Sequence, residues 1–144
     1  MPTFYSNLDT KTEIVCAGLI SLADLNAYQG MDTDDVTLPA AVCAAEGGDE
    51  YPLGSGNFWQ QVSIKAMSAG KRNNAASLTA HNAFCAQVFD IFIDSAIITT
   101  MGNAIVDYGV MGFRNRRINP TRIEGRRWIS ELTFEALVCA SDVN

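Results

Sequence analysis

The stretch WISELTFEALVC, residues 128–139, decides the fold because apolar and polar residues alternate along it. One side carries Trp128, Leu132, Phe134, Ala136 and Val138, and the other carries Glu131, Thr133 and Glu135. A period of two residues is typical of a β-strand with one buried face. Residues 58–67 alternate in the same way, so we expect a second half-buried strand there.

Two other segments have helical spacing. Thr10-Lys11-Thr12-Glu13 has the S/T-x-x-E form of a capping box, which predicts a helix that begins there. Gly30 is the expected end of this helix, since glycine readily adopts the conformation of a helix C-terminus. Ser77 is the expected N-cap of a second helix, which is apolar over most of its circumference and which we expect to end at Gly102.

Two further strands are expected over residues 40–45 and 105–113, on the basis of their apolar runs. Residues 46–57 are rich in glycine and proline and predict a loop, and residues 114–127 predict a long connection between the last two strands. The sequence therefore predicts one α+β domain over residues 1–144. Its two helices would pack on a mainly antiparallel four-stranded sheet.

Charge is distributed very unevenly along the chain, whose net charge is −6. Residues 114–127 hold six arginines against one acid: Arg114, Arg116, Arg117, Arg122, Arg126 and Arg127. Residues 1–58 hold nine acids against one base, and the acidic interface candidates among them are Asp32, Asp34, Asp35, Glu46, Asp49 and Glu50. The guanidinium group binds carboxylates and phosphates through paired hydrogen bonds. The arginines are therefore candidates to bind the acids of a neighbouring copy or to face DNA in a lumen. A solvated arginine loop is the plainer alternative.

The sequence offers little support for catalysis or for a bound cofactor. His81 is the only histidine, and Cys85 one turn later gives it a partner but no third group. The cysteines Cys16, Cys43, Cys85 and Cys139 lack metal-ligand spacing and read as reduced core residues. We therefore expect no enzyme activity, no metal and no cofactor. The chain also contains no apolar run of the length that a membrane helix needs.

The chain resembles the tail-terminator, or tail-completion, proteins of long-tailed bacteriophages over roughly residues 10–140. The features that carry the resemblance are Tyr28-Gln29-Gly30 at the end of the first helix, the strand around Leu38-Pro39-Ala40-Ala41-Val42, the strand entry Gly56-Asn57-Phe58-Trp59, the helix near His81, and the final strand at Arg126-Arg127-Trp128.

The resemblance implies a structural virion protein, assembled in the host cytoplasm, that forms a hexameric ring at the head-proximal end of the tail. Such a ring caps the tail tube protein, joins the head connector or neck protein, and lets DNA pass through its lumen. Another head–tail joining protein or a tail tube subunit would fit the same pattern. From a different class, a small module that binds an anionic molecule through its arginines is the alternative.

Overall fold

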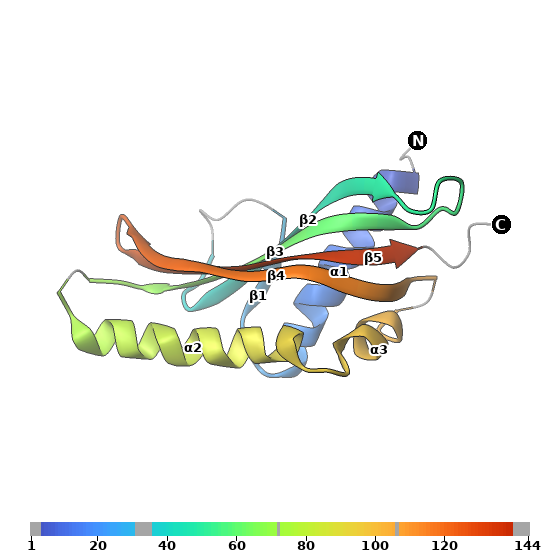
Figure 1. The fold of residues 1–144 in the computed structure, drawn as a ribbon. Coiled ribbons are helices and arrows are strands. Elements are labelled where there is room, and N and C mark those ends of the chain that lie inside the picture. The colour runs from blue at the N-terminus through green and yellow to red at the C-terminus, as the bar shows by residue number, and fades with distance from the viewer. Residues whose placement is uncertain (1–3, 31–35, 72, 106, 140–144) are drawn as a thin grey trace.

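The computed structural model describes residues 4–30, 36–71, 73–105 and 107–139 (Figure 1). These residues form three helices and a mixed five-stranded sheet, which confirms the predicted α+β class. The predicted two helices and four mainly antiparallel strands are wrong in number, because a short parallel strand and a separate short helix are also present. In chain order the elements are α1 (Phe4–Leu22), β1 (Ala27–Gln29), β2 (Ala40–Glu50), β3 (Phe58–Ala69), α2 (Ala75–Ile93), α3 (Ile97–Gly102), β4 (Gly109–Glu124) and β5 (Arg127–Cys139).

The sheet has the strand order β1-β2-β3-β5-β4. Three of its pairings are antiparallel, whereas β1 runs parallel to β2. The two strands that the alternation predicted are confirmed and lie next to each other, with Val62 opposite Phe134 and Ile64 opposite Leu132. All four of these side chains are buried, so the apolar positions of both strands face the core together.

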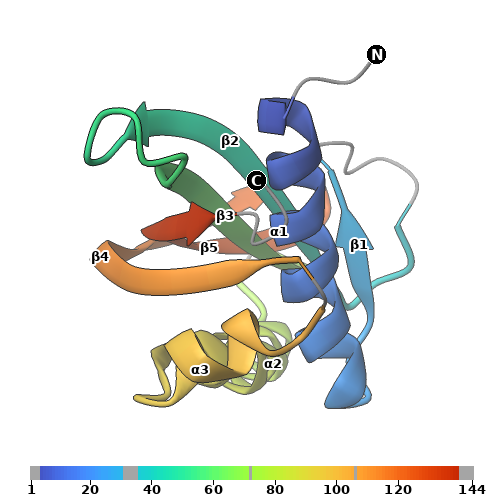
Figure 2. The ribbon, with the colours of Figure 1, turned by 90° about the vertical axis from the view of Figure 1, so that its right-hand side faces the viewer.

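The three helices cover one face of the sheet. Figure 1 shows α2 and α3 along this face, and Figure 2 shows α1 on the same side. The core between the two layers is built around Phe134, whose ring centroid lies 6.0 Å from that of Phe92 and 4.7 Å from that of Phe113. No described helix covers the opposite face, called here the uncovered face, although Val42, Met67 and Ile129 are buried there against Tyr28, Val36 and Leu38.

The first helix differs from the prediction at both of its ends. It begins at Phe4, so Thr10 lies inside α1 and the predicted capping box is wrong. The carboxylate of Glu13 instead accepts a hydrogen bond from the backbone N–H of Ala45, at 3.0 Å, and so ties α1 to β2. The helix also ends early, at Leu22, and the residues before Gly30 form β1.

The second helical segment is divided into α2 and α3. Asn74, rather than Ser77, is the N-cap of α2, because its side chain accepts a hydrogen bond from the backbone N–H of Ser77 at 2.9 Å. The helix ends at Ile93, and Gly102 ends the separate α3.

Two strands are longer than predicted. β2 continues through a bulge between Glu46 and Gly48, so only residues 51–57 of the predicted loop lie outside strands. β4 begins later than predicted, at Gly109, but continues to Glu124. All four cysteines are free, and only Cys139 is partly exposed.

Candidate functional site

The arginines lie on a β-hairpin, and the predicted long connection between the last two strands is wrong. β4 pairs with β5 as far as Glu124 and Arg127, so only Gly125 and Arg126 form the turn. Gly125 has a φ of 61°, a left-handed conformation that glycine adopts without strain. Four of the six arginines consequently belong to an edge strand, on which neighbouring side chains point to opposite faces unless a bulge intervenes.

Arg114 is held on the uncovered face of the sheet. Its guanidinium carbon lies 4.1 Å from the ring centroid of Trp59, and its Nη2 lies 3.2 Å from a carboxylate oxygen of Glu135. The side-chain amide of Asn115 also donates to Glu135, and the bonds from Asn115 and Arg114 lower the pKa of this carboxyl. Arg114 is therefore engaged within its own chain by a cation–π contact and an ion pair.

Arg116 and Arg122 are engaged as well, by different partners. Arg116 donates from Nη1 to the carbonyl of Phe92 at 3.1 Å, at the C-terminal end of α2 where carbonyls lack helical partners. Arg122 lies 2.9 Å from the carboxylate of Glu124 and, by hydrogen bonding and charge, lowers its pKa. Arg116 thus has a structural role that its sequence context did not reveal.

Arg117 and Arg126 are the two arginines of the hairpin whose side chains stay available. Both are exposed, and neither side chain has an ion pair or hydrogen bond to any residue in the described ranges. Arg127, by contrast, is half-buried at the start of β5. The backbone carbonyl of Arg126 accepts from Gly70 N–H at 2.8 Å, which fastens the hairpin turn to the chain segment before α2.

The acidic candidates fall into three groups. Asp32, Asp34 and Asp35 lie outside the described residues. Glu50 is engaged, since its carboxylate accepts from the backbone N–H groups of Gly54 and Gly56 at 2.8 and 3.0 Å, and these bonds lower its pKa.

Glu46 and Asp49 are exposed on the second half of β2. Asp9 of α1 lies close to this group. Burial raises the pKa of Asp9, and the charges of Glu13 and Glu46 raise it further. The neighbouring acids therefore create a negative potential at Asp9.

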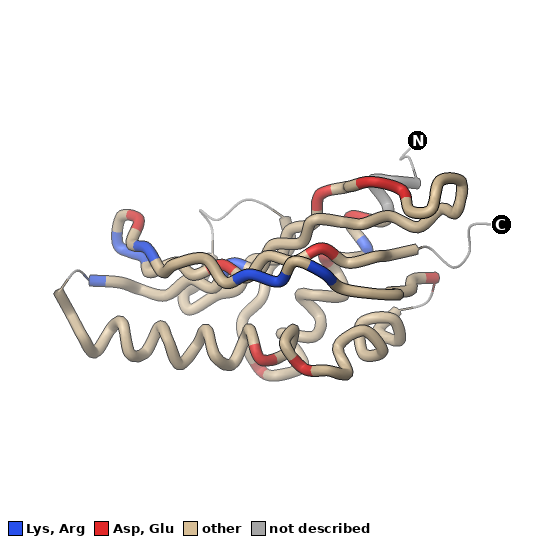
Figure 3. The backbone as a smooth tube through the Cα atoms, viewed as in Figure 1, with Lys and Arg blue, Asp and Glu red and all other residues tan. Residues whose placement is uncertain are grey.

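Basic and acidic residues lie along different strands of the sheet. In Figure 3 the basic residues follow β4 to the β4–β5 turn, and the acidic residues follow the second half of β2, whose end lies away from that turn. β3 spans this distance with 12 residues. At about 3.3 Å per residue, the two ends lie roughly 35 Å apart.

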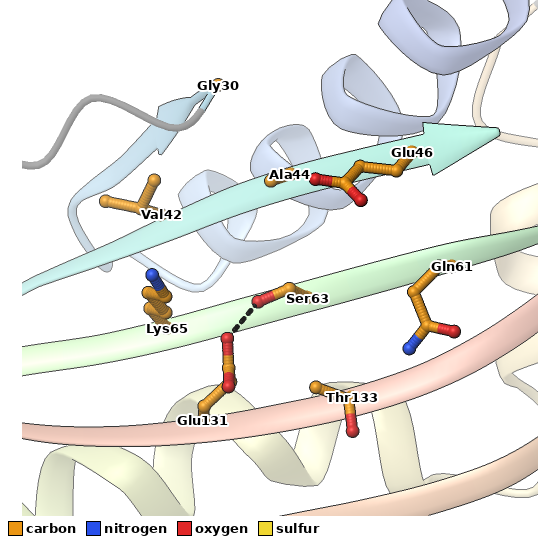
Figure 4. Close-up of a pocket in the computed structure, with 9 residues that line it drawn as sticks. All are labelled: Gly30, Val42, Ala44, Glu46, Gln61, Ser63, Lys65, Glu131 and Thr133. Atoms are coloured by element: carbon orange, nitrogen blue, oxygen red, sulfur yellow. Dashed lines mark hydrogen bonds between the residues drawn. The ribbon is translucent and has the colours of Figure 1, made fainter.

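A shallow hollow of about 220 Å³ lies on the uncovered face of the sheet (Figure 4). Ser63 of β3 donates a hydrogen bond to Glu131 of β5, and Asn119 of β4 donates to the same carboxylate at 3.0 Å. Lys65 adds an ammonium group on the same face. The lining residues are Gly30, Val42, Ala44, Glu46, Gln61, Ser63, Lys65, Glu131 and Thr133.

The sequence analysis did not identify this hollow. The only sign of it in the sequence is the set of polar residues that face outward on the two alternating strands, β3 and β5. Its charged groups are of both signs, and the carboxylate of Glu131 is already bonded within the chain. The hollow is suited to a polar contact rather than to general acid–base chemistry, for which an unengaged acid and base would need to converge.

A buried polar network surrounds His81. Its Nδ1 lies 2.9 Å from the Ser68 hydroxyl, and its Nε2 lies 2.9 Å from the Ser130 hydroxyl and 3.2 Å from the Cys85 sulfur. Burial lowers the pKa of His81 and raises that of Cys85, so both groups are held neutral. A nucleophilic cysteine needs the opposite shifts, toward thiolate and imidazolium.

His81 itself is fully buried, and Ser68, Cys85 and Ser130 are largely buried around it. The imidazole is therefore shielded from a substrate, although Ser68 also lines a surface pocket beside α2. The sequence showed the spacing of His81 and Cys85, but the two serines come from β3 and β5 and could not be recognised as partners.

Within the described ranges, no group of three or more metal-ligating side chains could hold a metal ion. The helices of the described residues are too short or too polar to cross a membrane. No protein-family model matches this sequence, and no curated protein matches it either.

Proposed function

We propose that this protein is a self-assembling virion component that closes the end of a phage tail tube as a ring, most simply a hexamer. It acts by binding and not by catalysis. The observation that carries the proposal is the placement of unengaged charge: Arg126 in the β4–β5 turn and the exposed Glu46 and Asp49 of β2 lie toward opposite ends of one sheet. Copies of such a subunit attract one another head to tail, and a head-to-tail contact repeated around a closed rotation forms a ring.

The separation of the charged ends supports association between copies. The ends lie roughly 35 Å apart, and interactions between exposed charges are screened over about 8–10 Å near physiological ionic strength. Each end is therefore free to interact with a different molecule. Exposed ion pairs contribute little affinity individually, so their role is to orient the approaching copies.

The unengaged arginines also suit the passage of DNA. Arg117 and Arg126 place permanent positive charge on the surface of a protein whose net charge is −6. Separate charges of this kind contact phosphates without binding DNA tightly over the whole molecule. In the proposed ring, the tail tube protein and the head connector or neck protein contact the two axial faces.

The first experiment measures the mass of the purified protein by light scattering after size exclusion, at 50 mM and 500 mM salt, followed by negative-stain imaging. A closed ring of about six subunits supports the proposal, and weaker assembly at high salt assigns the orienting role to the charged ends. Long tubes would reassign the protein as a tail tube subunit. A monomer at all concentrations, with or without a tube protein, would refute self-assembly.

A second candidate function is favoured by the same two free side chains. A monomeric module would bind a small anionic molecule at Arg117 or at Arg126, which the register of β4 and β5 places roughly 20 Å apart along the hairpin. This alternative predicts saturable binding of inorganic phosphate or a polyphosphate, measured by calorimetry, that is lost in the double variant R117Q/R126Q. Ring formation without such binding would exclude it.

A further inference from the structure

An open pocket of about 570 Å³ lies where the β4–β5 turn meets the start of α2. Its walls come from the end of β3, the loop after it, the start of α2 and the turn: Ala69, Gly70, Lys71, Asn74, Ser77 and Arg126. Two of these residues are cations and none is an acid. The sequence analysis did not connect Lys71 with Arg126, because the two residues lie far apart along the chain.

Close packing of the backbone brings Lys71 and Arg126 to the same pocket. The N–H of Gly70 donates to the carbonyl of Arg126 at 2.8 Å. A Cβ atom at Gly70 would lie 2.7 Å from the backbone nitrogen of Trp128, so this approach requires glycine. The indole N–H of Trp128 also donates to the hydroxyl of Ser77 at 3.0 Å, which ties the start of α2 to β5. The walls of the pocket are therefore fixed by bonds between elements.

Three groups that line this pocket have hydrogen-bond donors without a partner. Lys71 and Arg126 are exposed, and neither side chain has an ion pair or hydrogen bond to any described residue. The side-chain oxygen of Asn74 accepts from the N–H of Ser77 at 2.9 Å, so its amide nitrogen is the remaining group. That nitrogen has no partner in the described part of the chain. The pocket thus offers an ammonium, a guanidinium and an amide donor together.

The chain supplies no acid of its own to neutralise the pocket. Glu124, the acid of the hairpin, does not line the pocket and lies 2.9 Å from the guanidinium of Arg122. A cleft lined by charges of one sign attracts groups of the opposite sign. Ammonium and guanidinium groups donate and never accept, so they suit a group that only accepts, such as an ionised carboxylate.

We propose that this pocket receives the carboxylate of Asp49 from a second copy of the chain. Asp49 is exposed next to the end of β2, and its side chain has no hydrogen bond or ion pair to any described residue. It pairs with Trp59, near the start of β3, whereas the pocket begins where β3 ends. The length of β3 places the two roughly 35 Å apart, so they cannot meet within one chain. A contact between two different surfaces repeats from copy to copy, as a ring requires.

Two other occupants are less well matched. Glu46, the other exposed acid of β2, lies further from the end of the strand and borders the hollow on the uncovered face. A DNA phosphate has suitable chemistry, but the net charge of −6 repels DNA from the rest of the molecule. The acid and the pocket of this chain, in contrast, are always present in equal numbers.

This contact rests on the proposed function and specifies it further. Each copy uses Asp49 at one end of the sheet, and Lys71 with Arg126 at the other. Charged contacts of this kind fix the orientation and register of the copies. Arg117 does not line the pocket, so its side chain stays free to face DNA or an axial partner.

Charge reversal tests the two sides of the contact separately and together. The double variant Lys71→Glu/Arg126→Glu reverses the pocket, and Asp49→Lys reverses the acid. Each alone places like charges in contact, so the midpoint concentration of assembly should rise roughly tenfold at 50 mM salt. An equal mixture of the two variants has opposite charges at every contact between unlike copies. It should therefore assemble nearly as well as the wild type, in rings with an even number of copies.

The measurement is sedimentation velocity, with thermal unfolding to verify that every variant is folded. Arg117→Glu and Asp90→Lys, both at exposed positions outside the contact, are the matched controls and should leave the midpoint unchanged. A carbodiimide, which joins a carboxylate to a neighbouring lysine amine, identifies the contact directly. Peptide mass spectrometry of a mixture of 15N-labelled and unlabelled wild type should find Asp49 joined to Lys71 of another copy.

The outcomes separate this contact from the proposed function. If the wild type assembles but the pocket variant assembles equally well, or the mixture assembles no better than its components, the inference is wrong and the ring remains. A pocket variant that assembles normally but no longer binds a short labelled DNA duplex, measured by fluorescence anisotropy, would assign the pocket to phosphate instead. A wild type that never assembles refutes the proposed function and this contact with it.

Discussion

Protonation of His81 should couple the stability of this fold to pH. The imidazole is fully buried, and both of its nitrogens lie 2.9 Å from serine hydroxyls. The third polar neighbour, Cys85, is neutral. Burial lowers the pKa of His81 below its ordinary value of 6.5, because the charged imidazolium is poorly solvated there.

The sign of the effect follows from proton linkage. Below pH 6.5 the unfolded chain binds a proton at His81 more readily than the native chain does, so the free energy of unfolding decreases as pH falls. If native His81 remains neutral at pH 5.5, this linkage removes about 1.4 kcal/mol between pH 7.5 and 5.5, which is a ceiling set by the unfolded-state pKa. The loss is complete once pH has fallen through the lowered native pKa.

The test compares the wild type with His81→Gln, which retains polar groups but does not titrate. Urea denaturation at pH 7.5, 6.5 and 5.5 gives the free energy of unfolding of each protein. Other titrating groups contribute to the free energy of unfolding of both proteins. The informative quantity is therefore the free energy of unfolding of the wild type minus that of His81→Gln. This difference should decrease by up to about 1.4 kcal/mol as pH falls over this interval. A difference that does not change with pH would refute the assignment of a neutral, buried His81.

Four further substitutions test the local geometry. Arg116→Gln removes a charged donor from the last turn of α2 and should cost about 1 kcal/mol of stability, whereas Arg117→Gln should change it by less than about 0.5 kcal/mol. Urea midpoints measure this contrast, which equal costs would contradict. Gly48→Ala places a Cβ directly against the carbonyl oxygen of Trp59 and should destabilise the β2 bulge. The expected cost is about 2–3 kcal/mol. Gly18→Ala should do the opposite and raise the melting temperature by a few degrees, since about 0.5–1 kcal/mol of helix propensity is gained.

The strands that lie between the helices and solvent could be predicted from the sequence. β3 and β5 have one face in the core and the other open, so their apolar residues recur with a period of two. The second half of β2 and most of β4 are different, because the majority of their residues are exposed. Without a buried face there is no alternation, and glycine or charged residues then resemble a loop.

Helix ends were predicted less well, because residues that resemble helix caps in the sequence make tertiary contacts instead. Glu13 completes a sequence capping box but bonds instead to Ala45, which is 32 residues away along the chain. Three residues, 27–29, form β1 by pairing with β2, and no local pattern of that length can distinguish a strand edge from a helix end.

The candidate site shows the same limit. Clustering in sequence identified the arginines, but it could not separate Arg116, which bonds to α2, from Arg117, whose side chain is free. A bulge decides this difference, because the pairing of β4 with β5 shifts between Arg114 and Arg117.

The irregularity of β4 has a consequence for how safely the protein can be concentrated. A 16-residue strand at the edge of a sheet is a template onto which another chain can add and start a fibrous aggregate. Here the register shifts three times, and Pro120 removes a further N–H donor, so no long run of regularly spaced backbone groups remains. The β4 edge is thus a poor template for sheet-to-sheet growth between molecules crowded together at high concentration.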